Sequence, residues 1–270
     1  MPAIKIFQIY YSQETRRQLD GGFIPLDNST NERPDWREYW PIRRYLLNNR
    51  LELDTYYGFL SPKFREKTRL DSETVLRFLE VEPQGADVVT FSPFFDQMSF
   101  FLNLVEHGMA AHQTAAPTFR ECMAMLVPQF QVEDTCHTSL NSVFCNYFVA
   151  RSAFWLEWFE LCERIFDLAE RNDTPLGQAL NAGTTHDWQS VPAKVFVIER
   201  MASVLLSTEP RWRVKNYNPM ALPLSPARIA ALGAELVGLD ALKMAYTTHR
   251  HKQYKEAFLL LRERYRNSLI

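Results

Sequence analysis

The stretch Ala86-Asp87-Val88-Val89-Thr90-Phe91-Ser92-Pro93 decides the fold class of this 270-residue chain. Its β-branched and aromatic residues predict a buried strand, and the Ser-Pro pair predicts the turn that ends it. Two earlier stretches have the same character, IKIFQIYY at residues 4–11 and TYYGFL at residues 55–60. Because helical patterns separate these strands, the sequence predicts an α/β layer with a mainly parallel sheet.

Helical patterns fill most of the intervals between the strands. We predict helices at residues 36–48, 71–80, 97–109, 119–126, 152–170, 193–206, 225–236 and 239–266, further strands at 142–149 and 211–215, and loops at 20–34 and 172–190. No internal repeat or linker divides the chain. We therefore expect one domain over residues 1–270, with an α/β core at 1–220 and a helical extension at 221–270.

Composition excludes several classes of protein. The chain has 30 basic and 32 acidic side chains, a net charge of −2, and so no overall electrostatic footprint for nucleic acid. Its apolar stretches are far shorter than the roughly 20 residues that cross a bilayer. The four cysteines form no CxxC pair and the N-terminus does not resemble a signal peptide, so we expect a reducing, cytoplasmic compartment.

The ends of the predicted strands supply the first candidate site residues. In an open α/β sheet, ligands bind beyond the carboxyl ends of the strands. This rule selects polar and aromatic side chains suited to a base, a ribose or a sugar: Gln8, Tyr10, Tyr11, Ser61, Lys63, Ser92, Asp96 and Asn146. The alternative is that these residues form ordinary strand-end turns.

Two other groups of polar residues are candidates for a site. Glu199 and Arg200 interrupt an otherwise apolar helical pattern, where a charged pair costs free energy unless it is paired or functional. The alternative is that they form an exposed stripe. Asp27, Asn28 and Arg33, in the first long loop, are candidate contacts for a diphosphate or a sugar, although any polar loop has this composition.

The sequence lacks the motifs that are typical of several classes of enzyme and metal site. The chain has no GxGxxG, no P-loop and no GxSxG, and its histidines and cysteines do not have zinc-ligand spacing. His107 and His112 are expected at the surface or at a helix end. Cys145 lies within a predicted apolar strand and is expected to be a core thiol.

The order of these pieces resembles that of GT-A-type nucleotide-sugar glycosyltransferases of bacterial surface polysaccharide (capsule or O-antigen) biosynthesis. The resemblance spans residues 3–215 and rests on five segments in order: the strand at 5–11 with the aromatic helix around Glu38-Tyr39-Trp40, the segment 56–64 (YYGFLSPKF), the strand at 86–93, the strand and helix at 142–158, and the helix at 193–206 with its Glu-Arg pair.

The resemblance implies a single GT-A-like (Rossmann-like) domain that moves a sugar from a nucleotide-sugar donor to a hydroxyl of a saccharide or lipid-linked acceptor. No cofactor is implied. Because no Asp-x-Asp motif is present, the implied enzyme works without a metal held by that motif, and cationic side chains neutralise the leaving diphosphate; the candidates are Arg33, Arg43, Arg44 and Lys63.

The roles of the carboxylates depend on the stereochemistry of transfer, which the sequence does not decide. An inverting enzyme needs a carboxylate to accept the proton of the acceptor hydroxyl, and Asp96 and Glu199 are the candidates. A retaining enzyme does not need that base. An alternative from another class is a non-catalytic sugar-binding, nucleotide-binding or scaffold protein of a polysaccharide assembly complex, which the missing metal motif favours.

The C-terminal segment, residues 241–270, is basic and amphipathic. Its cations outnumber its carboxylates by five, and its apolar residues recur at helical spacing on another face. Such helices suit an anionic membrane surface or an acidic partner, which would place the chain at the inner face of the membrane. The alternative is a terminal helix that packs on the domain and leaves its basic face in solvent.

Overall fold

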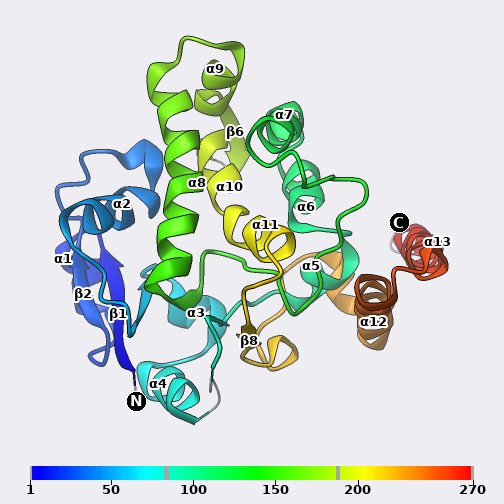
Figure 1. Cartoon of the computed structure of the whole chain (residues 1–270), viewed down its shortest axis with the longest axis horizontal. Helices are drawn as coiled ribbons and strands as arrows, with labels where there is room; N and C mark the ends of the chain where they lie inside the picture. Colours follow the sequence, from blue (N-terminus) through cyan, green and yellow to red (C-terminus); the bar gives the residue numbers. More distant parts are fainter. Residues whose placement is uncertain (1, 82–84, 187–188, 269–270) are drawn as a thin grey trace.

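The computed structural model, shown in Figure 1, describes residues 2–81, 85–186 and 189–268. It contains a six-stranded sheet in the order β2-β1-β3-β5-β4-β8. The strand β5 runs antiparallel to both of its neighbours, and the other five are parallel to one another. The predicted α/β class with a mainly parallel sheet is therefore confirmed. The strands are β1 (Ala3–Tyr10), β2 (Ile24–Asp27), β3 (Thr55–Leu60), β4 (Val88–Thr90), β5 (Phe148–Arg151) and β8 (Val214–Asn216), with a separate hairpin of β6 (Gly183–His186) and β7 (Gln189–Pro192).

Helices connect and cover the strands. They are α1 (Gln13–Arg17), α2 (Tyr39–Asn48), α3 (Phe64–Thr68), α4 (Ser72–Val81), α5 (Phe95–Phe100), α6 (Leu104–Ala111), α7 (Ala116–Leu126), α8 (Ser152–Arg171), α9 (Pro175–Asn181), α10 (Ala193–Ile198), α11 (Met201–Thr208), α12 (Ala234–His249) and α13 (Lys252–Ser268), with 3-10 turns η1 (Pro34–Trp36), η2 (Gln113–Ala115), η3 (Pro219–Ala221) and η4 (Arg228–Leu232).

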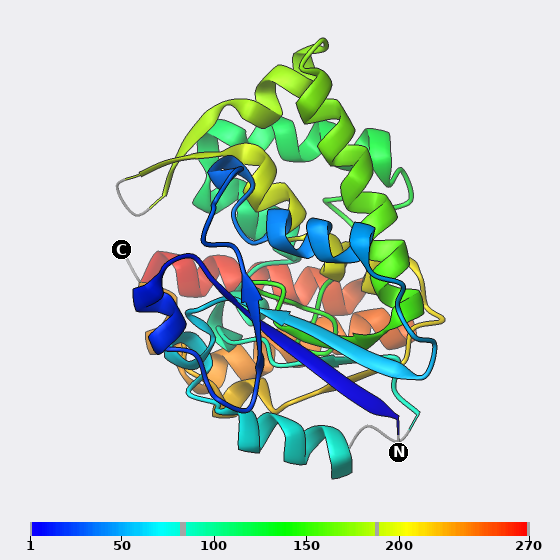
Figure 2. The same ribbon diagram turned by 90° about the vertical axis from the view of Figure 1, so that its left-hand side faces the viewer.

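Both faces of the sheet are buried, as β3 illustrates. Successive side chains of a strand point to opposite faces. Tyr57 and Phe59 pack in the cluster that contains the tryptophans of α8, whereas Tyr56 and Leu60 pack with the apolar residues of α4. Figure 2 shows α2 and α8 above the sheet and α4 below it. This double burial explains why β3 is apolar along its whole length.

Three predicted non-helical segments differ from the structure. The predicted strand at 142–149 is reduced to its end, because Cys145 and Asn146 have φ values of 58° and 54°, which a strand cannot accommodate. The predicted loop at 20–34 contains the edge strand β2, which pairs with β1. The predicted connection at 172–190 contains α9 and the two strands of the hairpin.

The predicted helix at 97–109 is also wrong in its continuity. It divides into α5 and α6, because Asn103 caps the second helix by accepting a hydrogen bond from Glu106 N at 2.8 Å. The amide of Asn103 also donates to the carbonyls of Val132 and Thr135, at 2.7 and 2.9 Å. These tertiary hydrogen bonds hold Asn103 outside the helix.

The helix predicted at 193–206 breaks at Glu199 and Arg200, between α10 and α11. Arg200 N donates to Val197 O, three residues back, instead of continuing the α-helical pattern. The Arg200 guanidinium donates to Phe196 O at 3.2 Å and so satisfies the carbonyl that the break leaves free. The Arg200 side chain therefore replaces the backbone hydrogen bond to Phe196 O that a continuous helix would contain.

The C-terminal extension is a pair of packed helices, α12 and α13, joined at Arg250 with a φ of 57°. The helix predicted at 225–236 is instead the 3-10 turn η4 followed by the first residues of α12. The apolar side of the pair packs on α5 through Leu239 and Phe258, both fully buried.

The predicted basic surface is smaller than expected, because Lys243 is buried and Arg262 pairs with Glu106 at 2.8 Å. The last two residues of the predicted segment lie outside the described ones.

Lys243 gives a pH-dependent prediction. Its ammonium donates to the carbonyls of Met98 and, at 2.7 Å, Phe101, at the end of α5. Burial lowers the pKa of Lys243 to about 8, whereas Asp240 and Glu106 act to raise it and Arg262 to lower it. Between pH 8 and the ordinary lysine value of 10.5, the unfolded chain binds more protons at this site, so stability should rise with pH across that window.

The measurement is urea unfolding of wild type and Lys243→Met at several pH values from 7.5 to 10. The free energy of unfolding of the wild type should increase relative to that of the variant as the pH rises. Parallel pH profiles for the two proteins would show that Lys243 has an ordinary pKa in the folded state.

Within the described part of the chain, no helix is both long enough and apolar enough to cross a membrane.

Candidate functional site

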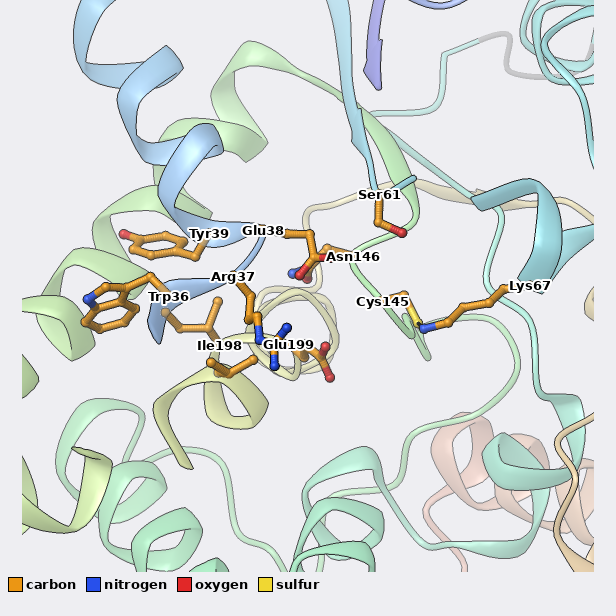
Figure 3. A pocket seen from close by; sticks show the side chains of 11 residues that line it. Trp36, Arg37, Glu38, Tyr39, Ser61, Lys67, Cys145, Asn146, Ile198 and Glu199 are labelled. Carbon is orange, nitrogen blue, oxygen red and sulfur yellow. Dashed lines mark hydrogen bonds between the residues drawn. The ribbon is translucent and has the colours of Figure 1, made fainter. Parts of the chain in front are cut away.

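A small pocket lies at the edge of the sheet where β3 ends (Figure 3). Because β5 is antiparallel, the residues before it lie at the same edge as the residues after β3. Ser61 follows β3, Asn146 precedes β5, Glu38 begins α2, Lys67 comes from α3, and Glu199 lies at the end of α10. Five separate segments thus converge at the carboxyl edge of the sheet, where the topological rule predicts a ligand site.

The pocket holds two carboxylates, Glu38 and Glu199. Burial raises the pKa of Glu38, the nearby Glu199 carboxylate raises it further, and Lys67 and Arg37 act in the opposite direction. Glu199 is more open, with 32% of its side chain exposed, and it pairs with Arg200 at 2.7 Å. The two carboxylates therefore lie near each other in different environments.

Arg200 anchors Glu199 from the protein interior. Only 3% of Arg200 is exposed, and besides Glu199 and Phe196 O it contacts the ring nitrogen of His107 at 3.3 Å. Burial and the Arg200 charge lower the pKa of His107 well below its usual value, so the ring is neutral. His112 is buried and stacks on Phe196 with centroids 3.7 Å apart. His112 ends α6, which agrees with the helix-end alternative, whereas His107 lies within α6 and its ring contacts the buried Arg200.

Lys67 is the cation that points into the pocket. Its Nζ lies 3.2 Å from the sulfur of Cys145. Burial lowers the pKa of Lys67, but Cys145, Glu199 and Glu38 outweigh that effect, so the net shift is upward and Lys67 is charged at neutral pH. Cys145 is half-buried in the pocket wall, and the expectation of a core thiol inside a strand is wrong.

Two polar atoms in or beside the pocket lack a hydrogen-bond partner among the described residues. They are the side-chain oxygen of Asn146, a residue that is 7% exposed, and the hydroxyl of Tyr11. Burial raises the pKa of Tyr11, and the Glu38 carboxylate raises it further, which places that hydroxyl beside the pocket. Buried polar atoms without partners cost free energy, so the Asn146 oxygen is available to a ligand, whereas the Tyr11 hydroxyl also lies within reach of the Glu38 carboxylate.

The structure brings together only some of the candidate site residues. Ser61, Asn146 and Glu199 line the pocket, and Arg200 lies behind Glu199. The others do not line it. Gln8 accepts a hydrogen bond from Asp20 N at 2.9 Å, Ser92 accepts one from Phe144 N at 2.7 Å, the Tyr10 hydroxyl faces Asp27 and lowers the pKa of that carboxyl, and Asn28 is buried at the end of β2.

Asp96 does not line the pocket. It is fully buried, and its carboxylate accepts hydrogen bonds from the backbone and hydroxyl of Ser225 and from the amide of Gln97, at 2.9 Å for Ser225 N and for Gln97 Nε2. These contacts join α5 to the segment before η4. The geometry is that of a structural carboxylate.

The cations expected to neutralise a diphosphate also lie away from the pocket. Arg33 pairs with Glu170 at 2.8 Å, Arg43 with Glu163 at 2.8 Å and Arg44 with Glu32 at 4.0 Å, and Lys63 is exposed. The arginines hold the first loop and α2 to carboxylates of α8 and of the loop itself. Lys67 and Arg37 line the pocket in their place.

Sequence reasoning missed Glu38, Lys67 and Cys145 as site residues. Glu38 precedes an aromatic helix and Lys67 lies in a five-residue helix that the pattern did not reveal. In the sequence, the only feature that marks Glu38 is its position near Trp36, and the only feature that marks Lys67 is its position near Ser61. Among the described residues, no group of three or more His, Cys, Asp or Glu side chains is arranged to hold a metal.

Comparison with known proteins gives one similar structure. No family model and no curated protein matches the chain. Among solved structures, the chain is similar to the WbbM bifunctional glycosyltransferase in its apo form, with a TM-score of 0.44 and 15% identity. The similarity covers 79% of this chain and 44% of that one. The chain therefore spans less than half the length of that protein.

Proposed function

We propose that the chain is a glycosyltransferase that moves a sugar from a nucleotide-sugar donor to a hydroxyl of a saccharide or lipid-linked acceptor, without an Asp-x-Asp metal. The observation that supports this most is the meeting of Glu38, Glu199 and Lys67 in one pocket at the carboxyl edge of the sheet. Carboxylates can accept a hydroxyl proton, and an ammonium can stabilise a leaving diphosphate.

The volume of the pocket limits what enters it. About 40 Å³ is available, which is room for a few water-sized groups and far less than the roughly 300 Å³ of a typical ligand site. In the proposed complex only the reacting atoms enter the pocket, and the nucleoside lies along the open strand edge beside Tyr11. Lys67 and Arg37 then face the diphosphate.

In this arrangement Glu199 is the base. It is partly exposed and is held by Arg200, so its carboxylate is positioned to accept the proton of an incoming hydroxyl. Glu38 is the more buried carboxyl and orients a sugar hydroxyl by hydrogen bonding. The Asn146 side-chain oxygen accepts from a second hydroxyl. This set of roles corresponds to an inverting reaction.

The test of function is a thermal-shift titration with uridine, guanosine, cytidine and adenosine diphosphates. One of them should raise the melting temperature, because a ligand that binds only the folded state stabilises it by mass action. At a ligand concentration of 100 Kd the gain is about 2.7 kcal/mol. Adding EDTA should leave the shift intact.

The matched variants are Lys67→Met and Tyr11→Ala. Each should reduce the shift, because one removes the diphosphate cation and the other the proposed base contact. Lys63→Met, an exposed lysine outside the pocket, is the control and should bind as wild type does. No shift with any nucleotide would favour a scaffold protein, and a shift that depends strictly on Mn²⁺ or Mg²⁺ would overturn the metal-free reaction.

A further inference from the structure

The contact between Cys145 and Lys67 is not explained by the proposed reaction. Nζ of Lys67 lies 3.2 Å from Sγ of Cys145, and both side chains point toward each other across the pocket wall (Figure 3). Cys145 has a φ of 58°, a conformation that costs a residue with a Cβ about 1 kcal/mol or more. The fold thus holds a thiol at this position against a local preference.

Cys145 is also more accessible than the other cysteines. Cys122, Cys136 and Cys162 are buried, whereas Cys145 is only partly buried and lines the pocket. The pocket volume of about 40 Å³ admits hydrogen peroxide, which is little larger than water, but not a bulky disulfide reagent. Burial raises the pKa of Cys145 to about 11 and the Lys67 ammonium opposes that shift, so the reactive thiolate is a small fraction and oxidation is slow.

We propose that Cys145 and Lys67 form a peroxide-dependent covalent sulfur–nitrogen link. In the first step the sulfur attacks hydrogen peroxide, an S–O bond forms, the O–O bond breaks, and the products are the sulfenic acid of Cys145 and water. In the second step the Lys67 ammonium first gives a proton to solvent, because only the neutral amine has the lone pair that attacks. The amine then attacks that sulfur, an S–N bond forms, the S–O bond breaks, and the hydroxide leaves as water with a second proton from the nitrogen.

The electrons balance over the two steps. The sulfur gives up two electrons, one molecule of peroxide is reduced to water, and the linked protein has lost two hydrogen atoms in total. Sulfenic acids condense with a neighbouring backbone nitrogen to a sulfenamide, and in the proposed link the nitrogen is that of the Lys67 side chain. At 3.2 Å, Lys67 is in contact before the oxidation begins.

The link would also regulate the pocket, and this part rests on the proposed function. The S–N link removes the positive charge of Lys67 and ties α3 to the segment before β5. A donor diphosphate would then lose its cation, so oxidised protein should bind nucleotide more weakly. Thiol reductants should reverse the effect by attacking the sulfur of the link.

The experiment is peroxide treatment of the full chain, followed by intact mass measurement and non-reducing peptide mapping. The expected product has lost two hydrogen atoms and contains one crosslinked pair of peptides, carrying residues 67 and 145, that dithiothreitol separates. Lys67→Arg is the matched control, because it keeps a positive charge but its guanidinium does not condense. In that variant the sulfenic acid should persist and be trapped by dimedone, and Cys145→Ser should not react.

Formation of the link is measured without any activity assay, so the result does not depend on whether the proposed function is correct. Oxidation of wild-type Cys145 to the sulfenic, sulfinic or sulfonic acid with no crosslinked pair would overturn the proposal. So would an absence of reaction at Cys145 in folded protein that is oxidised at another cysteine. If the link forms and nucleotide binding is unchanged, the chemistry holds and only the regulatory part is wrong.

Discussion

Replacing Glu199 with Gln is expected to lower the rate of sugar transfer by 10²- to 10⁴-fold while the chain stays folded. The amide is nearly isosteric but cannot accept the proton of the acceptor hydroxyl, and a positioned base contributes about that factor. Arg200 retains contacts with Phe196 O and with His107, so the break between α10 and α11 should survive. The measurements are the turnover number with the donor identified by thermal shift, and the circular dichroism of the variant.

Two controls separate a chemical role from a structural one. Glu199→Asp keeps the negative charge beside Arg200 but withdraws the carboxylate from the pocket, so it should fold like wild type and be slow. Glu38→Gln should weaken substrate binding more than it slows turnover. Normal turnover in folded Glu199→Gln would place Glu199 among ordinary surface ion pairs, and unfolding of that variant would make Glu199 a structural partner of Arg200.

Asp96→Asn should behave in the opposite way, with a large loss of stability and little change in chemistry. Its carboxylate accepts three hydrogen bonds in a fully buried setting. The amide turns one acceptor into a donor that faces other donors, and hydrogen bonds to a buried charge contribute roughly 1.5 to 3 kcal/mol each. We expect the free energy of unfolding to fall by about 3 kcal/mol and turnover per folded molecule to stay within about twofold.

Ser225→Ala is the matched variant for Asp96. It removes the hydroxyl that donates to the carboxylate and leaves the Ser225 backbone donor in place. Because the two side chains share one network, the double variant should lose less stability than the sum of the single losses. Additive losses would show that Asp96 and Ser225 are independent, and a slow but stable Asp96→Asn would return Asp96 to the candidates for the base.

The sequence was sufficient where a structure depends on local pattern. The strand β3 was predicted with its bounds, and the helix at 152–170 is α8 with one more residue, because periodicity over such lengths is strong. The strand-end rule also placed Ser61 and Asn146 among the candidates, and Glu199 was a candidate because it interrupts an apolar helical pattern.

The predictions that were wrong concern residues whose interaction partners are distant in the chain. Arg33 and Arg43 looked like free cations until the fold placed Glu170 and Glu163 of α8 beside them. Asp96 was a candidate base in the sequence, but in the fold its carboxylate accepts hydrogen bonds from Ser225. A charged side chain acquires its role from the charges and hydrogen bonds around it, and these come from elsewhere in the chain.

By itself, then, the sequence determined the α/β class, the buried strands and the covering helices, because those follow from side-chain size and period along a short window. The tertiary structure alone decided that Glu38, Lys67, Cys145 and Glu199 share one pocket. The antiparallel course of β5 and the left-handed conformation at Cys145 bring that segment to the carboxyl edge of β3. Neither feature has a local signal, because each is stabilised by packing against residues far away in the sequence.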